Sequence, residues 1–292
     1  MTSAARSHAV EEPRLAARFL RVRGGIGAIN EVRLLAGRSL RHIPRIPEKV
    51  FGALAMPLVF VLLFAYVFGS AIDVPGGGDY HEYLVSGIFA QSMIGTLPGI
   101  SVGVASDIRS GLMDRLRALP ISRGSVVAGR TIAELVELIA GTVVVAACGL
   151  LVGWAPHGSV LDTLGAFTLL LVMAFAVTWA GVWLGLMVRD PDGADGIAMS
   201  VIFPLMFLSG IFVPVAGLPD GLRQIAEWNP VTALAQAMRE LFGSPTGITP
   251  DVWPLQHPVL ASLGWAAVLM AIFVPLSVRR YRRMGRDPRS DL

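Results

Sequence analysis

Six long apolar stretches constrain this chain most strongly. A helix needs about 20 consecutive apolar residues to cross the ~30 Å hydrocarbon layer of a bilayer. The chain of 292 residues is 54% hydrophobic and 15% charged, which leaves too little polar surface for a soluble globule of that length. We therefore predict an all-α membrane protein with six transmembrane helices. Their approximate positions are residues 50–69, 84–105, 126–153, 161–188, 196–215 and 258–278.

The distribution of basic residues predicts the orientation of these helices. Arg and Lys accumulate on the cytoplasmic side of membrane proteins. With a cytoplasmic N-terminus, 22 of the 24 basic residues fall on that side, and the other two are Arg223 and Arg239. We therefore expect a multi-pass protein of the bacterial inner membrane with both termini in the cytoplasm. Because the arginines adjoin apolar stretches, we expect no nucleic-acid partner despite the basic pI.

Two terminal regions flank the predicted transmembrane domain of residues 50–278. Residues 1–49 read as a cytoplasmic basic tail that includes an amphipathic helix in the membrane interface, and residues 279–292 read as a second basic cytoplasmic tail. Helical spacing on one face supports the interfacial helix, and the residues that repeat at this spacing are Ile29, Val32, Ala36, Leu40 and Ile43.

The segment between the fifth and sixth stretches predicts two short amphipathic helices. Each has three apolar residues on one face, and Asn229 and Pro230 separate the two helices. Both are too short to cross a bilayer. We predict an extracytoplasmic re-entrant or interfacial helical hairpin at about residues 217–243, with a plain external loop carrying two surface helices as the alternative. The apolar faces are Leu218, Leu222 and Ile225, then Leu234, Met238 and Leu241.

A short amphipathic helix is also predicted in the cytoplasm, at about residues 107–120. Leu112, Leu116 and Leu119 follow helical spacing, and Pro120 ends the pattern. An uncovered apolar face on such a helix favours a groove in a partner protein. The alternative is that the helix lies on lipid headgroups.

Two runs of sequence resemble known segments of one family. The run GLMDRLRALPISR at residues 111–123, followed by Gly129 and Arg130, resembles the coupling segment of ABC type-2 permeases, particularly the daunorubicin-resistance drug-export branch. The run FPLMFLSGIFVP at residues 203–214, with Trp228-Asn229-Pro230 and Arg239 after it, resembles the fifth span and external hairpin of the same family. The resemblance covers nearly the whole chain.

The resemblance implies a function and a set of partners. It implies the membrane permease subunit of an ATP-driven ABC exporter, which moves an amphiphilic drug-like or lipid-like molecule out of the cytoplasm or inner leaflet. It also implies an assembly of two cytoplasmic ABC ATPase subunits with two permeases, the second being another copy or a paralogue. Membrane lipid and the amphiphilic substrate are the other expected partners.

The resemblance also implies roles for particular residues. The ATPase-coupling candidates are Leu112, Met113, Arg115, Leu116 and Leu119. The candidates for a substrate path along spans two and five are Phe89, Met93, Phe203, Met206, Phe207 and Phe212. Ordinary helix packing is the alternative for each residue of the path.

The residues themselves argue against an enzyme. Lys49 is the only lysine and no glycine-rich loop precedes it, so a phosphate-binding lysine motif is absent from the sequence. We therefore expect ATP and Mg to bind to a separate ATPase subunit, and no cofactor to bind to this chain. The five histidines are scattered, which predicts no metal site. The acidic turn of Asp190, Asp192 and Asp195 resembles a calcium loop only loosely and is better explained as a solvated turn that caps span five.

Two features within the spans have open interpretations. Arg130, Glu134 and Glu137 place ionisable groups in the third span, where they form either a helix-face ion pair or the proton relay of a gradient-driven carrier or channel. The second span has small residues at Gly95 and at the two positions four and eight residues later. This face permits close helix packing, within the chain or at a dimer seam.

Overall fold

The structure is a computed structural model, and it describes most of the chain after residue 78. The described residues are 59, 62–68, 74, 79–111, 123–188, 190–244 and 251–284, without the side chains of 65, 68, 123–134 and 282. All regular elements in these ranges are helical. The predicted interfacial helix of residues 1–49, the tail beyond residue 284 and most of the predicted first span lie outside the described residues.

The helices of the described part differ widely in length. Their bounds are η2 (Leu63–Phe68), α4 (Tyr80–Ile94), α5 (Thr96–Arg109), α7 (Arg123–Val152), α8 (Val160–Met187), α9 (Pro191–Phe207), η3 (Val215–Gly217), α10 (Asp220–Glu227), α11 (Pro230–Phe242), α12 (Trp253–Gln256) and α13 (Pro258–Met284). η2 is a π-helix and η3 a 3-10 helix.

Four helical segments in the described part are long and apolar enough to cross a membrane. They are the nearly continuous α4 and α5, most of α7, the whole of α8, and α13 up to Tyr281. Gly95 separates α4 from α5. Repeated apolar helices of this length define a multi-pass membrane protein.

The predicted fifth span differs from the structure at both ends. α9 has 17 residues, from Pro191 to Phe207, instead of covering residues 196–215. It begins earlier because the Asp190 side chain accepts a hydrogen bond from the backbone N–H of Gly193, which confirms the predicted aspartate cap. It ends earlier, at Phe207, three residues after Pro204, which has no N–H to donate to the helix. A helix of this length covers only about 26 Å, and the chain continues as an irregular segment.

The two short helices of the predicted hairpin are present, but they occupy different environments. α11 packs against α4, α8 and α13, and its Leu234, Met238 and Phe242 are fully buried. α10 exposes most of its residues. Only the second helix therefore contributes substantially to the core.

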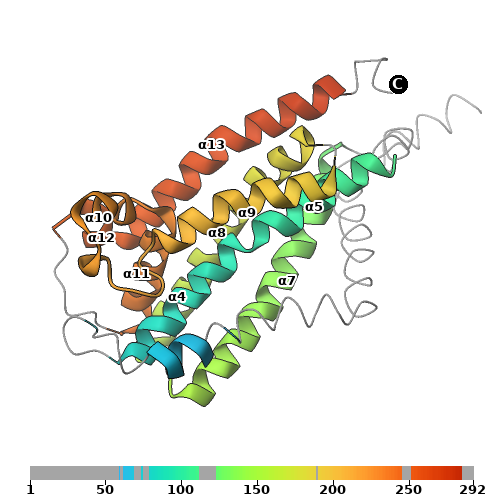
Figure 1. The fold of residues 1–292 in the computed structure, drawn as a ribbon. Helices are drawn as coiled ribbons and strands as arrows, with labels where there is room; N and C mark the ends of the chain where they lie inside the picture. The colour runs from blue at the N-terminus through green and yellow to red at the C-terminus, as the bar shows by residue number, and fades with distance from the viewer. Residues whose placement is uncertain are drawn as a thin grey trace, which may run out of the picture.

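The bundle has two distinct ends. α10, α11 and α12 gather at one of them (Figure 1), which we call the hairpin end. At the opposite end, the Arg109 side chain at the end of α5 contacts the carboxylate of Asp190, which precedes α9, with an N–O distance of 3.0 Å.

α5 packs closely on α8. A Cβ atom on Gly181 would lie 2.8 Å from Cγ2 of Ile100, and one on Gly185 would lie 2.5 Å from the carbonyl oxygen of Ser101. Larger residues at these two positions would force the helices apart. α5 and α8 are therefore in direct backbone proximity along their shared face.

Candidate functional site

The irregular segment after α9, residues 208–214, is the centre of a polar network. We call it the 208–214 loop. Within it Ile211 and Phe212 are buried, with 0% and 5% of their surfaces exposed. Non-helical backbone is tolerated at membrane depth only where protein or water satisfies its polar groups. In this structure, side chains from α4 and α11 bond to the loop backbone.

Arg239 on α11 makes the largest number of these contacts. Its side chain is buried, with the residue only 2% exposed. The Nη2 group donates to the carbonyl oxygens of Gly210 at 2.7 Å and Ile211 at 3.2 Å, and Nε donates to the Tyr83 carbonyl at 3.2 Å. The guanidinium carbon also lies 3.5 Å from the centroid of the Tyr83 ring. Carbonyl dipoles and an aromatic face thus stabilise the charge.

Two tyrosines of α4 bond to the same loop. The Tyr83 hydroxyl donates to the Gly210 carbonyl oxygen at 2.8 Å, so that this oxygen accepts from both Tyr83 and Arg239. The Tyr80 hydroxyl donates to the Phe212 carbonyl oxygen at 3.0 Å. α4 and α11 therefore both bond to the 208–214 loop, and they share the Gly210 carbonyl oxygen as an acceptor.

Asn229 connects the end of α9 to the start of α11. Its Nδ2 group donates to the carbonyl oxygens of Leu205 at 2.8 Å and Leu208 at 2.7 Å, which α9 leaves free where it ends. Its Oδ1 accepts from the backbone N–H of Val231 and caps α11. Nearby, the Thr232 hydroxyl accepts from the backbone N–H of Gly210 at 3.0 Å.

Gly87 permits α4 to approach the loop this closely. A Cβ atom at this position would lie 2.4 Å from the carbonyl oxygen of Ile211. Together these contacts form one site, which we call the α4–α9–α11 junction. It consists of Tyr80, Tyr83, Gly87, the 208–214 loop, Asn229, Thr232 and Arg239.

An aromatic cluster lies beside the junction. The rings of Phe89, Trp154, Phe167 and Phe242 come from α4, the α7–α8 connection, α8 and α11, and neighbouring centroids are 5.2 to 5.6 Å apart. The C-terminus of α11 is fastened nearby, because its Phe242 carbonyl oxygen accepts from two backbone N–H groups of the α7–α8 connection. The cluster forms an apolar core at the hairpin end.

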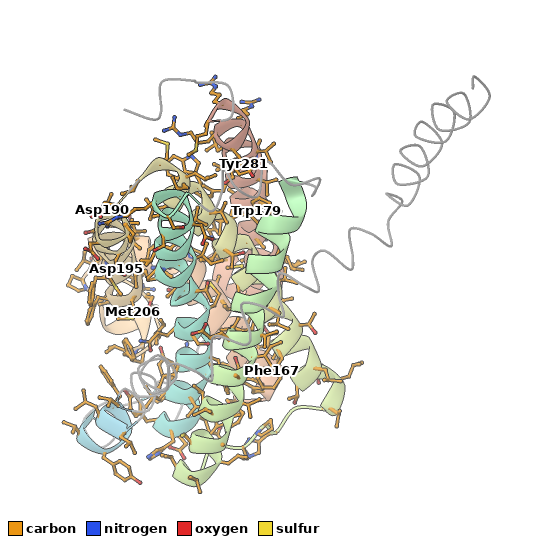
Figure 2. The ribbon with its side chains drawn as sticks, turned by 90° about the vertical axis from the view of Figure 1, so that its right-hand side faces the viewer. Phe167, Trp179, Asp190, Asp195, Met206 and Tyr281 are labelled. Atoms are coloured by element: carbon orange, nitrogen blue, oxygen red, sulfur yellow. The ribbon has the colours of Figure 1, made fainter. Side chains whose placement is uncertain are left out.

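The predicted substrate-path residues fall into two groups. Phe89, Met93, Met206 and Phe212 are buried, at 0%, 1%, 5% and 5% exposure, and Phe212 stacks on Phe64 at 4.3 Å. Phe203 and Phe207 of α9 are 52% and 60% exposed and stack on each other at 6.1 Å. The structure therefore does not bring the six side chains to one surface of this chain. Figure 2 shows Met206 with Asp190 and Asp195 on the α9 side of the bundle, apart from Phe167.

The other predicted site residues are largely outside the described part. This applies to the five coupling candidates, Leu112, Met113, Arg115, Leu116 and Leu119, and to the side chains of Arg130 and Glu134. Glu137 is described and lies half-buried on α7. Both sets of roles stay predictions.

Sequence reasoning used Arg239 in the count of basic residues and in the family resemblance, but it predicted no contacts for it and gave no role to Tyr80, Tyr83 or Thr232. The sequence does contain one indication that Arg239 is buried. Ala235 and Phe242, four residues before and three after it, share its side of the helix and are both apolar. A charge on an apolar helical face indicates a buried and specifically bonded group.

The fold and the junction together define a class: a multi-pass helical membrane protein in which an irregular loop after α9 packs against α4 and the short helix α11. The sequence profile of the ABC-2 type transporter family matches residues 30–242. This chain belongs to that family. Members are transmembrane permease subunits of ABC transporters, distinct from the ATPase subunits with which they work.

Named relatives of the chain are also permeases. It is 29% identical to the daunorubicin resistance ABC transporter permease protein DrrB1 of Streptomyces coeruleorubidus, over 84% of this chain and 83% of the relative. It is 22% identical to the probable doxorubicin resistance ABC transporter permease protein DrrC of Mycobacterium tuberculosis, over 88% of this chain and 92% of the relative. The probable multidrug ABC transporter permease YbhR of Escherichia coli is 24% identical over 66% of this chain and 52% of its own length.

Proposed function

We propose that this chain is the permease of an ABC exporter that moves an amphiphilic, drug-like or lipid-like molecule out of the cytoplasm or inner leaflet. The observation that carries the proposal is the family match over residues 30–242, which includes both the predicted coupling segment and the hairpin. The drug-resistance names of two relatives, DrrB1 and DrrC, support an amphiphilic substrate.

The complete transporter contains two permeases and two cytoplasmic ATPases. Each permease has six membrane spans, of which α9 with the 208–214 loop is the fifth, and the hairpin re-enters the bundle from the extracytoplasmic side. The burial of α11 between α4, α8 and α13 supports this arrangement over a hairpin that lies entirely on the surface. In the structure residues 107–109 belong to α5 and a turn follows at Ser110 and Gly111, so the coupling helix lies after this turn and before Pro120, and it docks in a cleft of the ATPase.

The contacts of α5 and α9 suggest how ATPase movement is transmitted. The coupling segment follows Arg109, and Arg109 pairs with Asp190 at the start of α9. A displacement of the coupling segment therefore acts on spans two and five together. At the hairpin end the same two spans meet again, through Tyr80 and Tyr83 on the 208–214 loop. Movement at one end can thus alter the junction at the other.

The test is transport by purified components. The permease, its ATPase and an anthracycline as probe are combined in inside-out vesicles, and accumulation of the probe is followed by fluorescence. We expect accumulation only with both proteins and ATP, and no ATP hydrolysis by the permease alone. Accumulation driven by a proton gradient without the ATPase would contradict the exporter proposal and favour the carrier.

Orientation is tested separately by labelling single cysteines from outside intact cells, in a background where Cys148 is replaced by alanine. Arg223→Cys in α10 is expected to react with a membrane-impermeant maleimide. Arg117→Cys in the coupling segment is expected to react only after the membrane is permeabilised. The reverse pattern would show that the proposed orientation is wrong.

A further inference from the structure

Two side chains on the neighbouring helices α4 and α7 carry buried polar atoms that have no hydrogen-bond partner in the described part of the chain. Thr142 of α7 is only 8% exposed, and its hydroxyl oxygen bonds to no other described group. Gln91 of α4 is partly buried, and its side-chain carbonyl oxygen Oε1 is also buried and unpaired. A buried polar group without a partner is unfavourable, so each of these two atoms needs an explanation.

Gln91 and Thr142 lie at the same level of the bundle. α4 begins and α7 ends at the same end of the bundle, so the two helices run in opposite directions (Figure 1). Near that end, a Cβ atom on Gly149 would lie 3.0 Å from Cγ1 of Val85. Seven residues deeper, about 10 Å and two helical turns, α4 reaches Ser92 beside Gln91, and α7 reaches Thr142. We call the packed surface between these two levels, residues 85–92 of α4 and 142–149 of α7, the α4–α7 interface.

The hydroxyl of Thr142 differs from other hydroxyls in the spans. Serine and threonine within a helix commonly donate to a carbonyl oxygen three or four residues earlier. Ser92 donates to the Phe89 carbonyl oxygen at 2.7 Å, and Thr178 of α8 donates to the Phe175 carbonyl oxygen at 2.7 Å. Thr142 makes no such bond. Its hydroxyl is therefore left for a group that the described chain does not supply.

A third unpaired group lies at the outer end of the α4–α7 interface. Cε3 of Trp154 would lie 3.1 Å from a Cβ atom on Gly149, and the indole N–H of Trp154 is buried without a partner in the described part. The same ring packs edge-on against Phe89, with 5.4 Å between the centroids. The interface thus combines aromatic surface with a donor at Trp154, an acceptor at Gln91, and a hydroxyl at Thr142 that can do both.

The sequence of the α4–α7 interface indicates which chemical groups it can bind. Residues 85–92 read VSGIFAQS and residues 142–149 read TVVVAACG, so neither stretch contains an acidic or basic side chain. A buried ion without a counter-charge costs far more than a buried hydroxyl or carbonyl. The interface therefore fits neutral groups. A ligand hydroxyl can donate to Oε1 of Gln91 and accept from Thr142 at the same time.

We propose that the α4–α7 interface is a binding subsite for a hydroxyl group of the exported molecule, with Thr142 and Gln91 as residues that determine specificity. The indole N–H of Trp154 is a further donor, for a carbonyl or hydroxyl oxygen of the same molecule. The substrate class is then an aromatic amphiphile with neutral hydroxyl groups. This inference rests on the proposed exporter function and names the substrate chemistry within it. The subsite lies between α4 and α7, whereas the predicted substrate path follows spans two and five.

Substitutions that remove only the polar atoms test the proposal. Thr142→Val and Gln91→Met keep the approximate size of each side chain, and Thr142→Ser keeps a hydroxyl. Thr178→Val is the matched control, because Thr178 is 0% exposed but its hydroxyl is bonded within α8. Each variant is reconstituted with the ATPase in phosphatidylcholine nanodiscs. Equilibrium binding of doxorubicin, a hydroxyl-bearing aromatic probe, is followed by its fluorescence anisotropy, and the stability of the complex without probe is measured by thermal unfolding.

We expect Thr142→Val and Gln91→Met each to weaken doxorubicin binding about five- to tenfold, which is the effect of losing one hydrogen bond. Neither substitution should lower the stability of the complex without probe, because the removed atoms have no partner there. Thr142→Ser should bind doxorubicin as wild type does. Thr178→Val should leave binding unchanged and lower the stability, because it breaks a buried hydrogen bond.

Two results would overturn the proposal. The first is wild-type affinity for doxorubicin in both Thr142→Val and Gln91→Met. The second is a loss of stability in Thr142→Val as large as that in Thr178→Val, or a failure of Thr142→Val to fold. It would show that the hydroxyl of Thr142 is already satisfied without substrate, as by a buried water. Either result leaves the exporter proposal standing, because that proposal is decided by ATP-dependent accumulation in vesicles and not by the affinity of these variants.

Discussion

The guanidinium carbon of Arg239 lies 3.5 Å from the centroid of the Tyr83 ring, and the same guanidinium donates to the carbonyl oxygen of Tyr83. These two residues are 156 positions apart in the chain. Their contact joins α11 to α4, and both side chains also bond to the carbonyl oxygen of Gly210. This pair of residues therefore links α4, the 208–214 loop and α11.

Replacing Arg239 with methionine should destabilise the folded protein. Methionine keeps much of the apolar stem but removes the Arg239 donors from the buried carbonyl oxygens of Tyr83, Gly210 and Ile211, and Gly210 keeps only its bond from the Tyr83 hydroxyl. We expect a loss of about 3 kcal/mol in the free energy of unfolding, because each unsatisfied buried group costs roughly 1–3 kcal/mol and the removed charge offsets part of that cost. This change in the free energy of unfolding is measured by unfolding the protein in mixed micelles that contain increasing fractions of a denaturing detergent.

Two further variants separate the contributions of this pair. Tyr83→Phe keeps the aromatic face but removes one hydrogen bond, and should cost only about 1 kcal/mol. Arg239→Lys keeps the charge but not the forked donors, and should fall between wild type and Arg239→Met. If Arg239→Met were as stable as wild type, the contacts of Arg239 would not hold the junction together.

Replacing Asn229 with aspartate tests the link between α9 and α11. Aspartate preserves the acceptor that caps Val231 but replaces the donor to Leu205 and Leu208 with a carboxylate oxygen. We expect a loss of at least about 2 kcal/mol from two broken hydrogen bonds, with added repulsion between oxygen atoms. The same unfolding assay measures it, with Thr232→Ser as a control that keeps a hydroxyl acceptor for Gly210. Equal stability of Asn229→Asp and wild type would show that other groups satisfy the end of α9.

Gly87→Ala should disturb the junction by steric overlap alone. The added Cβ would lie 2.4 Å from the carbonyl oxygen of Ile211, so α4 and the 208–214 loop have to separate. Overpacking of this kind typically costs about 1–3 kcal/mol. Gly141→Ala on α7 is the matched control, because nothing lies within 4 Å of its added Cβ. A measured unfolding free energy that is the same for both variants would contradict the close approach.

Leu116→Asp tests the proposed coupling helix, which lies outside the described residues. If Leu116 enters an ATPase cleft, an unpaired carboxylate there costs several kcal/mol and should abolish co-purification with the ATPase and substrate-stimulated ATP hydrolysis. The spans do not need this residue for burial, so the variant should still insert and fold in detergent. Asp192→Asn in the first turn of α9 is the control and should have little effect. Normal complex formation and transport by Leu116→Asp would show that the coupling assignment is wrong.

Three spans could be predicted closely from the sequence because hydrophobic length determines them. The predicted segments 126–153, 161–188 and 258–278 correspond to α7, α8 and α13, with starts within three residues of those observed. The end of α9 could not be predicted in this way. Residues 208–214 are as apolar as a membrane span, so hydrophobicity alone predicts that the helix continues through them. The helix can end at Phe207 because Asn229, from another part of the chain, donates hydrogen bonds to the free carbonyl oxygens of Leu205 and Leu208.

The sequence by itself determined that this is a helical membrane protein with a short paired-helix hairpin, because apolar length and helical periodicity are local properties. Membership of a permease family could also be predicted from two short runs of residues, 111–123 and 203–214. Only the tertiary structure decided that α11 packs inside the bundle while α10 faces outward, and that Arg239 is a buried donor and not an exposed charge. Those outcomes depend on which carbonyl oxygens and ring faces meet across distant segments, and on whether α4 can approach the 208–214 loop at Gly87.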